Sequence, residues 1–192
     1  MRRNGDQGYD PIDAVGLLRS YSRHRDYVRV ALGRVIHALT ERSIEHDASK
    51  MLDDEFAGFS RINRVARVNK FGTPEYEESM EQEREVIDLH FSRNRHHPER
   101  PSILGLASEV ERGSPDGFTY WSASDAAAMS FLDVIEMVCD WWGARMGYDD
   151  PRPWSDSVAL NLEKKGKYLS AEQLWLANQV AVFLGSQNGA AR

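Results

Sequence analysis

Two short stretches of the 192-residue sequence combine histidine with residues that could act beside it. In the first, His46 and Asp47 are adjacent, and Lys50 follows three residues after the aspartate. In the second, His90 and His97 are seven residues apart, which in a helix brings them within about 20° of the same face. Imidazole nitrogens and carboxylate oxygens are ligands of zinc, iron, manganese, nickel and cobalt. The two stretches therefore predict a metal site with open positions for water.

A third stretch places carboxylates inside the most apolar segment of the chain. Asp133, Glu136 and Asp140 are spaced i, i+3 and i+7, with Val134 and Met137 between them. A buried carboxylate is costly unless it is paired, protonated or bound to a metal. We therefore predict Asp140 as a metal ligand, with Asp133 as the alternative. Pairing of these aspartates with arginines in a buried network is the second explanation that stays open.

Helical geometry separates the two histidines of the N-terminal region. At about 100° per residue, His24 lies on the same stripe as Val28 and Val35. His37 comes thirteen residues after His24, which places it about 220° around the helix, on the opposite side. We therefore predict that His24 is a ligand and that His37 is a surface or structural residue.

His96 is an alternative ligand in the second stretch. It points away from the face of His90 and His97 for as long as the helix continues. A residue before a proline is pushed out of the helical region, and Pro98 follows this pair, so the helix can end earlier. The predicted metal ligands are His24, His46, Asp47, His90, His97 and Asp140, with His96 and Asp133 as alternatives.

The composition is typical of a globular protein of the cytoplasm. Apolar residues make up 41% and charged residues 28% of the chain, and the formal net charge is -6, which argues against duplex nucleic acid as a partner. No apolar run reaches the ~20 residues that a membrane span needs. The polar N-terminus lacks the apolar segment of a secretory signal. The single cysteine, Cys139, excludes an intramolecular disulfide.

Apolar residues recur every three or four positions along most of the chain, and strand alternation is missing. We therefore predict an all-α fold, a compact single-domain helical bundle over residues 10–192 behind a flexible tail of residues 1–9, with residues 150–192 as a C-terminal helical extension. Helices are expected over residues 11–39, 53–71, 74–94, 126–146, 155–164 and 170–184. A break is expected over residues 46–50, a helix cap at Ser124 or Asp125, and a long loop over residues 101–121.

The order of these motifs resembles the HD-domain superfamily of metal-dependent phosphohydrolases. The likeness is carried by HDASK at residues 46–50, HFSRNRHHPE at residues 90–99 and EMVCDW at residues 136–141. These segments look most like a group of phage and bacterial proteins with HDxSK, HxxxNxHHPE and EMxxDW motifs, from which no activity transfers. The superfamily resemblance implies a helical, HD-like fold that binds one or two divalent transition metals (Mn, Fe, Ni, Co or Zn). It also implies hydrolysis of a nucleotide or another small phosphate ester.

The same resemblance implies roles for individual residues. Asp47 would bridge two metals and orient a metal-activated water, which makes it catalytic together with Lys50. The phosphate charge would be neutralised by Lys50, Arg93 and Arg95. The ring nitrogens that face away from the metal would be positioned by contacts with Asn94, Glu99 and Glu136.

Two other functions stay open from the sequence. Some HD-like folds hold two irons with a comparable ligand set and use oxygen to cleave C–C or C–P bonds, so a di-iron oxygenase is one alternative. The other is a non-catalytic, phage-encoded binding protein that uses the metal for stability alone. The sequence is also compatible with a homo-oligomer and does not choose among substrates.

We predict that His46→Ala and Asp47→Ala each abolish metal binding, because each removes a ligand from the centre of the pattern. His37→Ala should leave the metal content unchanged. The measurement is the metal stoichiometry of each purified variant. If His37→Ala loses metal while His24→Ala keeps it, the helical-face argument has selected the wrong histidine.

Overall fold

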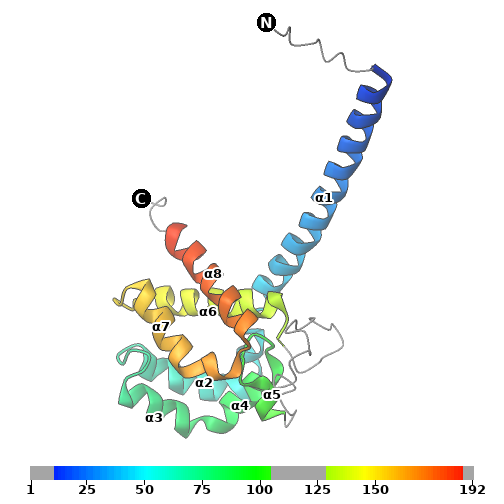
Figure 1. Cartoon of the computed structure of the whole chain (residues 1–192). Helices are drawn as coiled ribbons and strands as arrows, with labels where there is room; N and C mark the ends of the chain where they lie inside the picture. Colours follow the sequence, from blue (N-terminus) through cyan, green and yellow to red (C-terminus); the bar gives the residue numbers. More distant parts are fainter. Residues whose placement is uncertain (1–10, 105–128, 188–192) are drawn as a thin grey trace, which may run out of the picture. The chain divides into compact units, whose positions relative to one another are not determined.

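The computed structural model describes residues 11–104 and 129–187, and within these ranges every regular element is a helix (Figure 1). The predicted all-α fold is thereby confirmed. The tail expected over residues 1–9 lies outside the described residues. None of the described helices combines the length and the apolarity needed to cross a membrane. The elements are α1 (Pro11–Glu45), η1 (Ala48–Met51), α2 (Asp53–Ala66), α3 (Pro74–Gln82), α4 (Arg84–Arg93), α5 (Arg100–Ile103), α6 (Phe131–Gly147), α7 (Trp154–Lys165), η3 (Gly166–Tyr168) and α8 (Ala171–Gln187).

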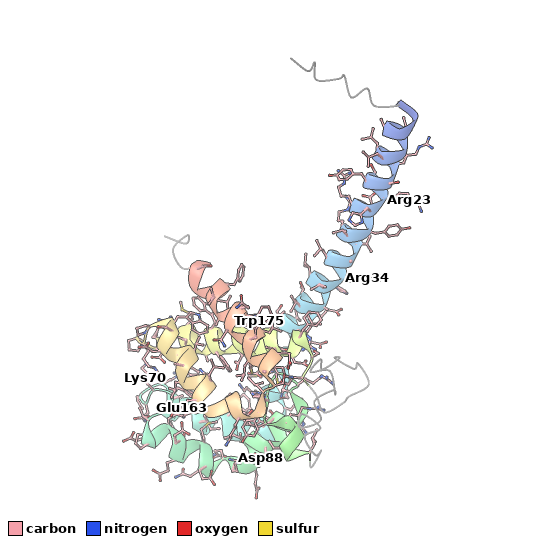
Figure 2. All side chains as sticks on the ribbon, in the orientation of Figure 1. Arg23, Arg34, Lys70, Asp88, Glu163 and Trp175 are labelled. Carbon is pink, nitrogen blue, oxygen red and sulfur yellow. The ribbon has the colours of Figure 1, made fainter. Side chains whose placement is uncertain are left out.

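The chain divides into two units, residues 1–44 and residues 45–192, whereas the sequence predicts one domain from residue 10. The described part of the first unit is α1, which carries Arg23 and Arg34 along its length (Figure 2). The apolar stripe predicted on this helix is exposed instead of buried, with Val28 43% and Val35 38% accessible. His24 is exposed on the same helix. The apolar residues of α1 have the predicted spacing. However, α1 is the one element that the structure describes in the first unit, so no second described helix of that unit covers them.

The second unit contains two groups of packed helices. One group consists of α2, α3, α4 and α5 together with η1, and the other consists of α6, α7 and α8 together with η3 (Figure 1). In the first group, Ile62, Ala66 and Ile87 are buried. The larger apolar core lies in the second group and is formed by Met129, Val134, Met137, Val138, Trp141, Val158, Leu169, Ala177 and Ala181.

Most helix bounds agree with the sequence prediction to within a few residues. The end of α1 at Glu45 fits the break predicted over residues 46–50. The single helix expected over residues 74–94 consists instead of α3 and α4, which are separated at Glu83 (φ -106°, ψ 25°). The loop expected over residues 101–121 lies mostly outside the described residues.

The end of α4 decides where the second histidine stretch lies. The helix ends at Arg93, and Asn94 is extended (φ -106°, ψ 114°). The Asn94 side chain donates to the backbone oxygen of His90 over 2.8 Å, and the Asn94 backbone N–H donates to the same oxygen over 3.0 Å. His96 and His97 therefore come after the end of the helix. The helical-face argument, by which His96 would point away from the face of His90, does not apply to them.

α6 begins with a capping box. The hydroxyl of Ser130 accepts from the backbone N–H of Asp133 over 3.2 Å, and the Asp133 carboxylate accepts from the backbone N–H of Ser130 over 2.6 Å. The cap expected at Ser124 or Asp125 lies outside the described residues. The burial of Asp133 thus has a local structural explanation that needs no metal.

Gly58 allows α2 and α4 to approach closely, and this packing can be tested. A Cβ at Gly58 would lie 2.8 Å from both γ carbons of Val86, which is stiff about χ1. Such overpacking costs about 1–3 kcal/mol, against the ~1 kcal/mol that alanine gains over glycine in a helix. We predict that Gly58→Ala lowers the free energy of unfolding, measured by denaturant titration.

Gly143→Ala is the matched control on α6, because nothing lies within 4 Å of the added Cβ. It should raise the free energy of unfolding by about 0.5–1 kcal/mol. If Gly58→Ala is stabilising to the same extent as this control, the close approach of α2 and α4 is contradicted.

Candidate metal centre

The turn after α1 directs the carboxylate of Asp47 into the second unit. Asp47 has φ 56° and ψ 15°, a left-handed conformation that few residues other than glycine, asparagine and aspartate adopt. Its Oδ1 atom lies 3.1 Å from Nε2 of His90 and 3.4 Å from Nε2 of His96. Two imidazole rings from α4 and from the segment after it therefore meet one carboxylate oxygen.

Asp47, His90, His96 and His97 form the first of three groups that could bind a metal, because one ligand atom of each lies within 4.8 Å of the others. The three histidines are 1%, 2% and 6% exposed. Both ring nitrogens of His97 are buried without a hydrogen-bond partner among the described residues, and Oδ1 of Asp47 faces Nε2 of His90 and of His96 without forming a hydrogen bond with either. Buried polar atoms nearly always have a partner, so these converging electron-pair donors are arranged as a ligand set.

A second group consists of His46, Asp47 and Asp140. Nε2 of His46 lies 3.6 Å from Oδ2 of Asp47 and 3.4 Å from Oδ1 of Asp140. Asp47 thus presents one carboxylate oxygen to each group. The arrangement is compatible with a carboxylate that bridges two metal ions, as the sequence predicts.

Glu136 holds two of the histidine rings from the other side. It belongs with His46 and His96 to the third possible metal-binding group, but its Oε1 atom lies 3.0 Å and 3.2 Å from their Nδ1 atoms. An ionised carboxylate accepts hydrogen bonds, so this contact favours a proton on each Nδ1 and leaves each Nε2 lone pair for a metal. Glu136 therefore has the supporting position that the sequence predicts for it.

Glu55 supports the His90 ring in the same way and was missed by the sequence analysis. It is 0% exposed, and its Oε2 atom lies 2.8 Å from Nδ1 of His90 and accepts from the hydroxyl of Ser49 over 2.9 Å. A signal was present in the sequence, because Glu55 precedes the buried Ile62 by seven residues and shares its helix face. The argument that selects Asp140, a carboxylate on an apolar helix face, applies to Glu55 as well.

The other two predicted ring-holding residues differ in position. Asn94 lies against His90 and donates to the hydroxyl of Ser49 over 2.8 Å, which places it beside the ring as predicted. Glu99 lies instead near the ammonium group of Lys165, at 3.9 Å.

The arginines that were expected to neutralise a phosphate have carboxylate partners. Arg93 donates to both oxygens of Asp54, over 2.9 and 2.6 Å, and to Oε1 of Glu55 over 2.8 Å. Arg95 lies 3.4 Å from Oδ2 of Asp133. Both arginines thus already have carboxylate partners, and the phosphate role expected of them stays a prediction. Asp133, with its arginine and its capping box, belongs to none of the three groups.

The sequence-predicted ligands otherwise divide into two sets. Five of the six that the sequence prefers, and the alternative His96, occur in the three groups of the second unit. His24 lies in the first unit, and its role as a ligand stays a prediction.

The ionisation of the cluster follows from burial and from close contacts. Burial opposes a charge on Asp47, but its contacts with the histidines and with Lys50 outweigh this and hold the pKa of the carboxyl well below its usual range. The contacts with Asp140 and Glu136 raise the pKa of His46 to about 10. Protonated imidazole thus balances part of the negative charge, a role that a metal cation could also fill.

His97 has the opposite ionisation. Burial, with smaller contributions from the charges of His96 and Lys165, lowers the pKa of His97 well below its ordinary value. The ring is therefore neutral at physiological pH, and neutral imidazole is the form that binds metals.

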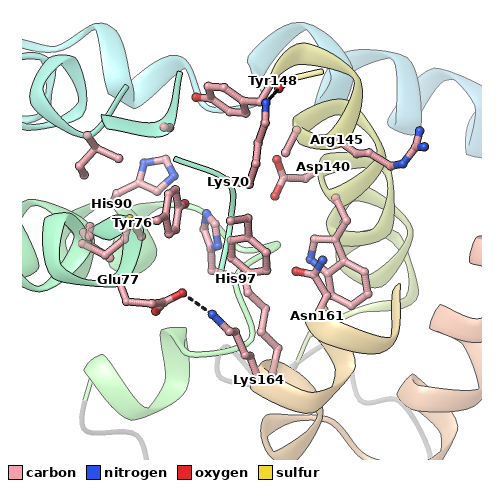
Figure 3. Close-up of a pocket in the computed structure, with 18 of the residues that line it drawn as sticks. Lys70, Tyr76, Glu77, His90, His97, Asp140, Arg145, Tyr148, Asn161 and Lys164 are labelled. Atoms are coloured by element: carbon pink, nitrogen blue, oxygen red, sulfur yellow. Dashed lines mark hydrogen bonds and ion pairs between the residues drawn. The ribbon is translucent and has the colours of Figure 1, made fainter. Parts of the chain in front are cut away.

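A cavity of about 350 Å³ adjoins the cluster, within the range of small-molecule sites. Figure 3 shows His90, His97 and Asp140 around its space. Lys50 also lines the cavity, and its ammonium group donates to Oδ2 of Asp47 over 2.5 Å. The cavity lies between α2, α3 and α4 on one side and α6 and α7 on the other. A ligand in it would reach the metal-binding groups and a cation together.

The chain belongs to a family of unknown function, DUF5662, whose model matches residues 16–186. A search of curated proteins and a search of solved structures each found no match. The family match covers the whole cluster but supplies no activity, so any function has to be argued from the geometry of the site.

We predict that Asp140→Asn sharply lowers metal affinity, because the amide keeps the shape of the carboxylate but loses the charge that attracts a cation. The metal-free protein should also melt at a somewhat lower temperature, because the substitution removes the carboxylate that pairs with Nε2 of His46. Asp133→Asn is the matched control and should keep its metal, since Asp133 is part of a helix cap. The measurements are metal stoichiometry and melting temperature, with and without a chelator.

The reverse pattern, with metal lost from Asp133→Asn and kept by Asp140→Asn, would make Asp133 the ligand. Full metal in both variants would show that the group around Asp140 does not bind a metal.

Proposed function

We propose that the second unit is a metal-dependent phosphohydrolase of the HD type that acts on a nucleotide or another small phosphate ester. The observation that supports this best is the set of buried imidazole and carboxylate atoms without hydrogen-bond partners, which lies beside a cavity that Lys50 also lines. His46 and Asp47 of the HDxSK motif form a further possible metal-binding group with the distant Asp140, which is the combination that the HD resemblance implies.

The donor set suits one or two divalent transition ions, such as Mn, Fe, Ni, Co or Zn. Nitrogen and oxygen donors in a mixed set are typical of catalytic sites that keep a position open for water or substrate. Such an ion, when bound, lowers the pKa of a water from 15.7 to about 7 and polarises a phosphoryl oxygen.

Two residues of the chain have defined roles in this proposal. The Oδ2 atom of Asp47 can accept a hydrogen bond from the attacking water and so orient it, while Oδ1 faces His90 and His96. Lys50 is held at this carboxylate and also lines the cavity, so its ammonium group can contact a phosphate that enters. With Arg93 and Arg95 paired elsewhere, Lys50 is the cation that we assign to the phosphate.

The proposal is tested by phosphate release from p-nitrophenyl phosphate and from nucleoside monophosphates. The protein is stripped with a chelator and reloaded with each metal in turn. We expect turnover that depends on the metal, and Lys50→Ala should lower kcat by roughly 10²-fold while the metal content stays unchanged. His37→Ala is the control, because this exposed histidine lies beside Glu41 on α1.

The alternatives give different results in the same preparations. Oxygen uptake by the iron-loaded protein without phosphate release would replace the proposal by an oxygenase. Metal binding that raises the melting temperature, without turnover of any substrate, would identify a non-catalytic protein stabilised by its metal.

A further inference from the structure

The cavity has a second chemical feature besides the metal-binding groups. The side chain of Trp141 lines it from α6 and that of Ser157 lines it from α7, and the two residues are only 4% and 5% exposed. Nε1 of Trp141 and Oγ of Ser157 have no hydrogen-bond partner among the described residues. A buried indole N–H nearly always donates to an acceptor, so these two atoms are unusual in their surroundings.

Trp154 shows what the same group does elsewhere in the second unit. Its Nε1 atom donates to the backbone oxygen of Ala181 over 2.8 Å. Both tryptophans belong to the packing of α6, α7 and α8, yet the partner of Trp141 is not supplied by the described chain. The cavity that Trp141 lines is where an acceptor from a ligand could reach it.

The remainder of the lining indicates what kind of ligand group would fit. Two of the cations that line the cavity already have carboxylate partners, since Lys164 pairs with Glu77, as Figure 3 shows, and Arg152 pairs with Asp150. These two cations are not free for a second anion, and the aromatic part of the lining suits a flat, uncharged group. The aromatic side chains that line the cavity are Phe59, Phe71, Tyr76, Phe91, Trp141 and Tyr148.

We propose that Trp141 and Ser157 form a recognition subsite for a flat, uncharged ring that carries a hydrogen-bond acceptor, either a carbonyl oxygen or a ring nitrogen. Nε1 of Trp141 donates to this acceptor, and the hydroxyl of Ser157 donates or accepts beside it. Trp141 directly follows Asp140 on α6, so the same helix carries a candidate metal ligand and the tryptophan of the subsite. Only the position of a phosphate at the other end of the ligand rests on the proposed function.

The subsite is tested by two-dimensional ¹H–¹⁵N NMR of the full chain, which resolves the indole N–H signals of the tryptophans. The probes are uridine, which offers carbonyl oxygens, and adenosine, which offers ring nitrogens, with ribose as the control. Trp141→Phe identifies the Trp141 signal by its loss. We expect at least one nucleoside to shift this signal, while the Trp154 signal stays in place because its hydrogen bond lies within the protein.

Affinities from the same titrations measure the contribution of each residue. Trp141→Phe and Ser157→Ala should each weaken nucleoside binding about three- to tenfold, the usual effect of one hydrogen bond. Because Trp141→Phe lacks the indole signal, its affinity is measured from the backbone signals that shift. Ribose should bind no better to the wild type than to either variant. If Trp141→Phe does not fold, Ser157→Ala and the wild-type indole shift still decide the question.

The proposal is overturned if neither nucleoside moves the Trp141 signal, or if ribose moves it equally, or if both variants bind nucleosides as tightly as the wild type. These probes carry no phosphate, so the result does not depend on hydrolysis. A Trp141 shift without any metal-dependent turnover would keep the subsite and refute the phosphohydrolase. Turnover without the shift would do the reverse.

Discussion

The partly buried carboxylate of Asp47, whose Oδ1 atom has no access to solvent, is the constraint on which the rest of the site depends. A carboxylate without compensation in a protein interior is strongly unfavourable, so the chain has to surround it with proton-bearing or positive groups. Three local features serve this purpose. α1 ends at Glu45, the backbone at Asp47 is left-handed, and α4 ends at Arg93 so that His96 can approach. The left-handed turn at Asp47 and the end of α4 together bring the carboxylate and the ring of His96 within 3.4 Å.

The cluster also joins the two helix groups of the second unit. α4 carries His90 in the first group, whereas α6 carries Glu136 and Asp140 in the second. The carboxylates of α6 reach His46 and His96 across this boundary. The charge balance of the site and the packing of the groups are thereby linked. A cation that binds here would stabilise the folded unit by mass action, because the unfolded chain does not bring these residues together.

The sequence was sufficient for those parts of the site that depend on residue type and on short spacing. His46, Asp47 and Asp140 were selected by their motifs and by a carboxylate on an apolar face, and the structure groups them. His96 is only an alternative in the sequence prediction because its position depends on where α4 ends, and the periodicity does not show that the helix ends at Arg93. The arginines and the exposed stripe of α1 show a second limit. Which carboxylate faces an arginine, and whether an apolar face is covered, are properties of tertiary packing.

Two of the three groups that could bind a metal differ in their access to solvent. In the group of His90 and His96 the side chains are only 1% and 2% exposed, whereas those of His46 and Asp140 are 28% and 24% exposed. Asp47 connects the two groups through its separate oxygens. Both groups reach the cavity, the buried one through His90 and His97 and the more open one through Asp140. A ligand in the cavity would therefore meet both groups at once, beside the ammonium group of Lys50 at the carboxylate that they share.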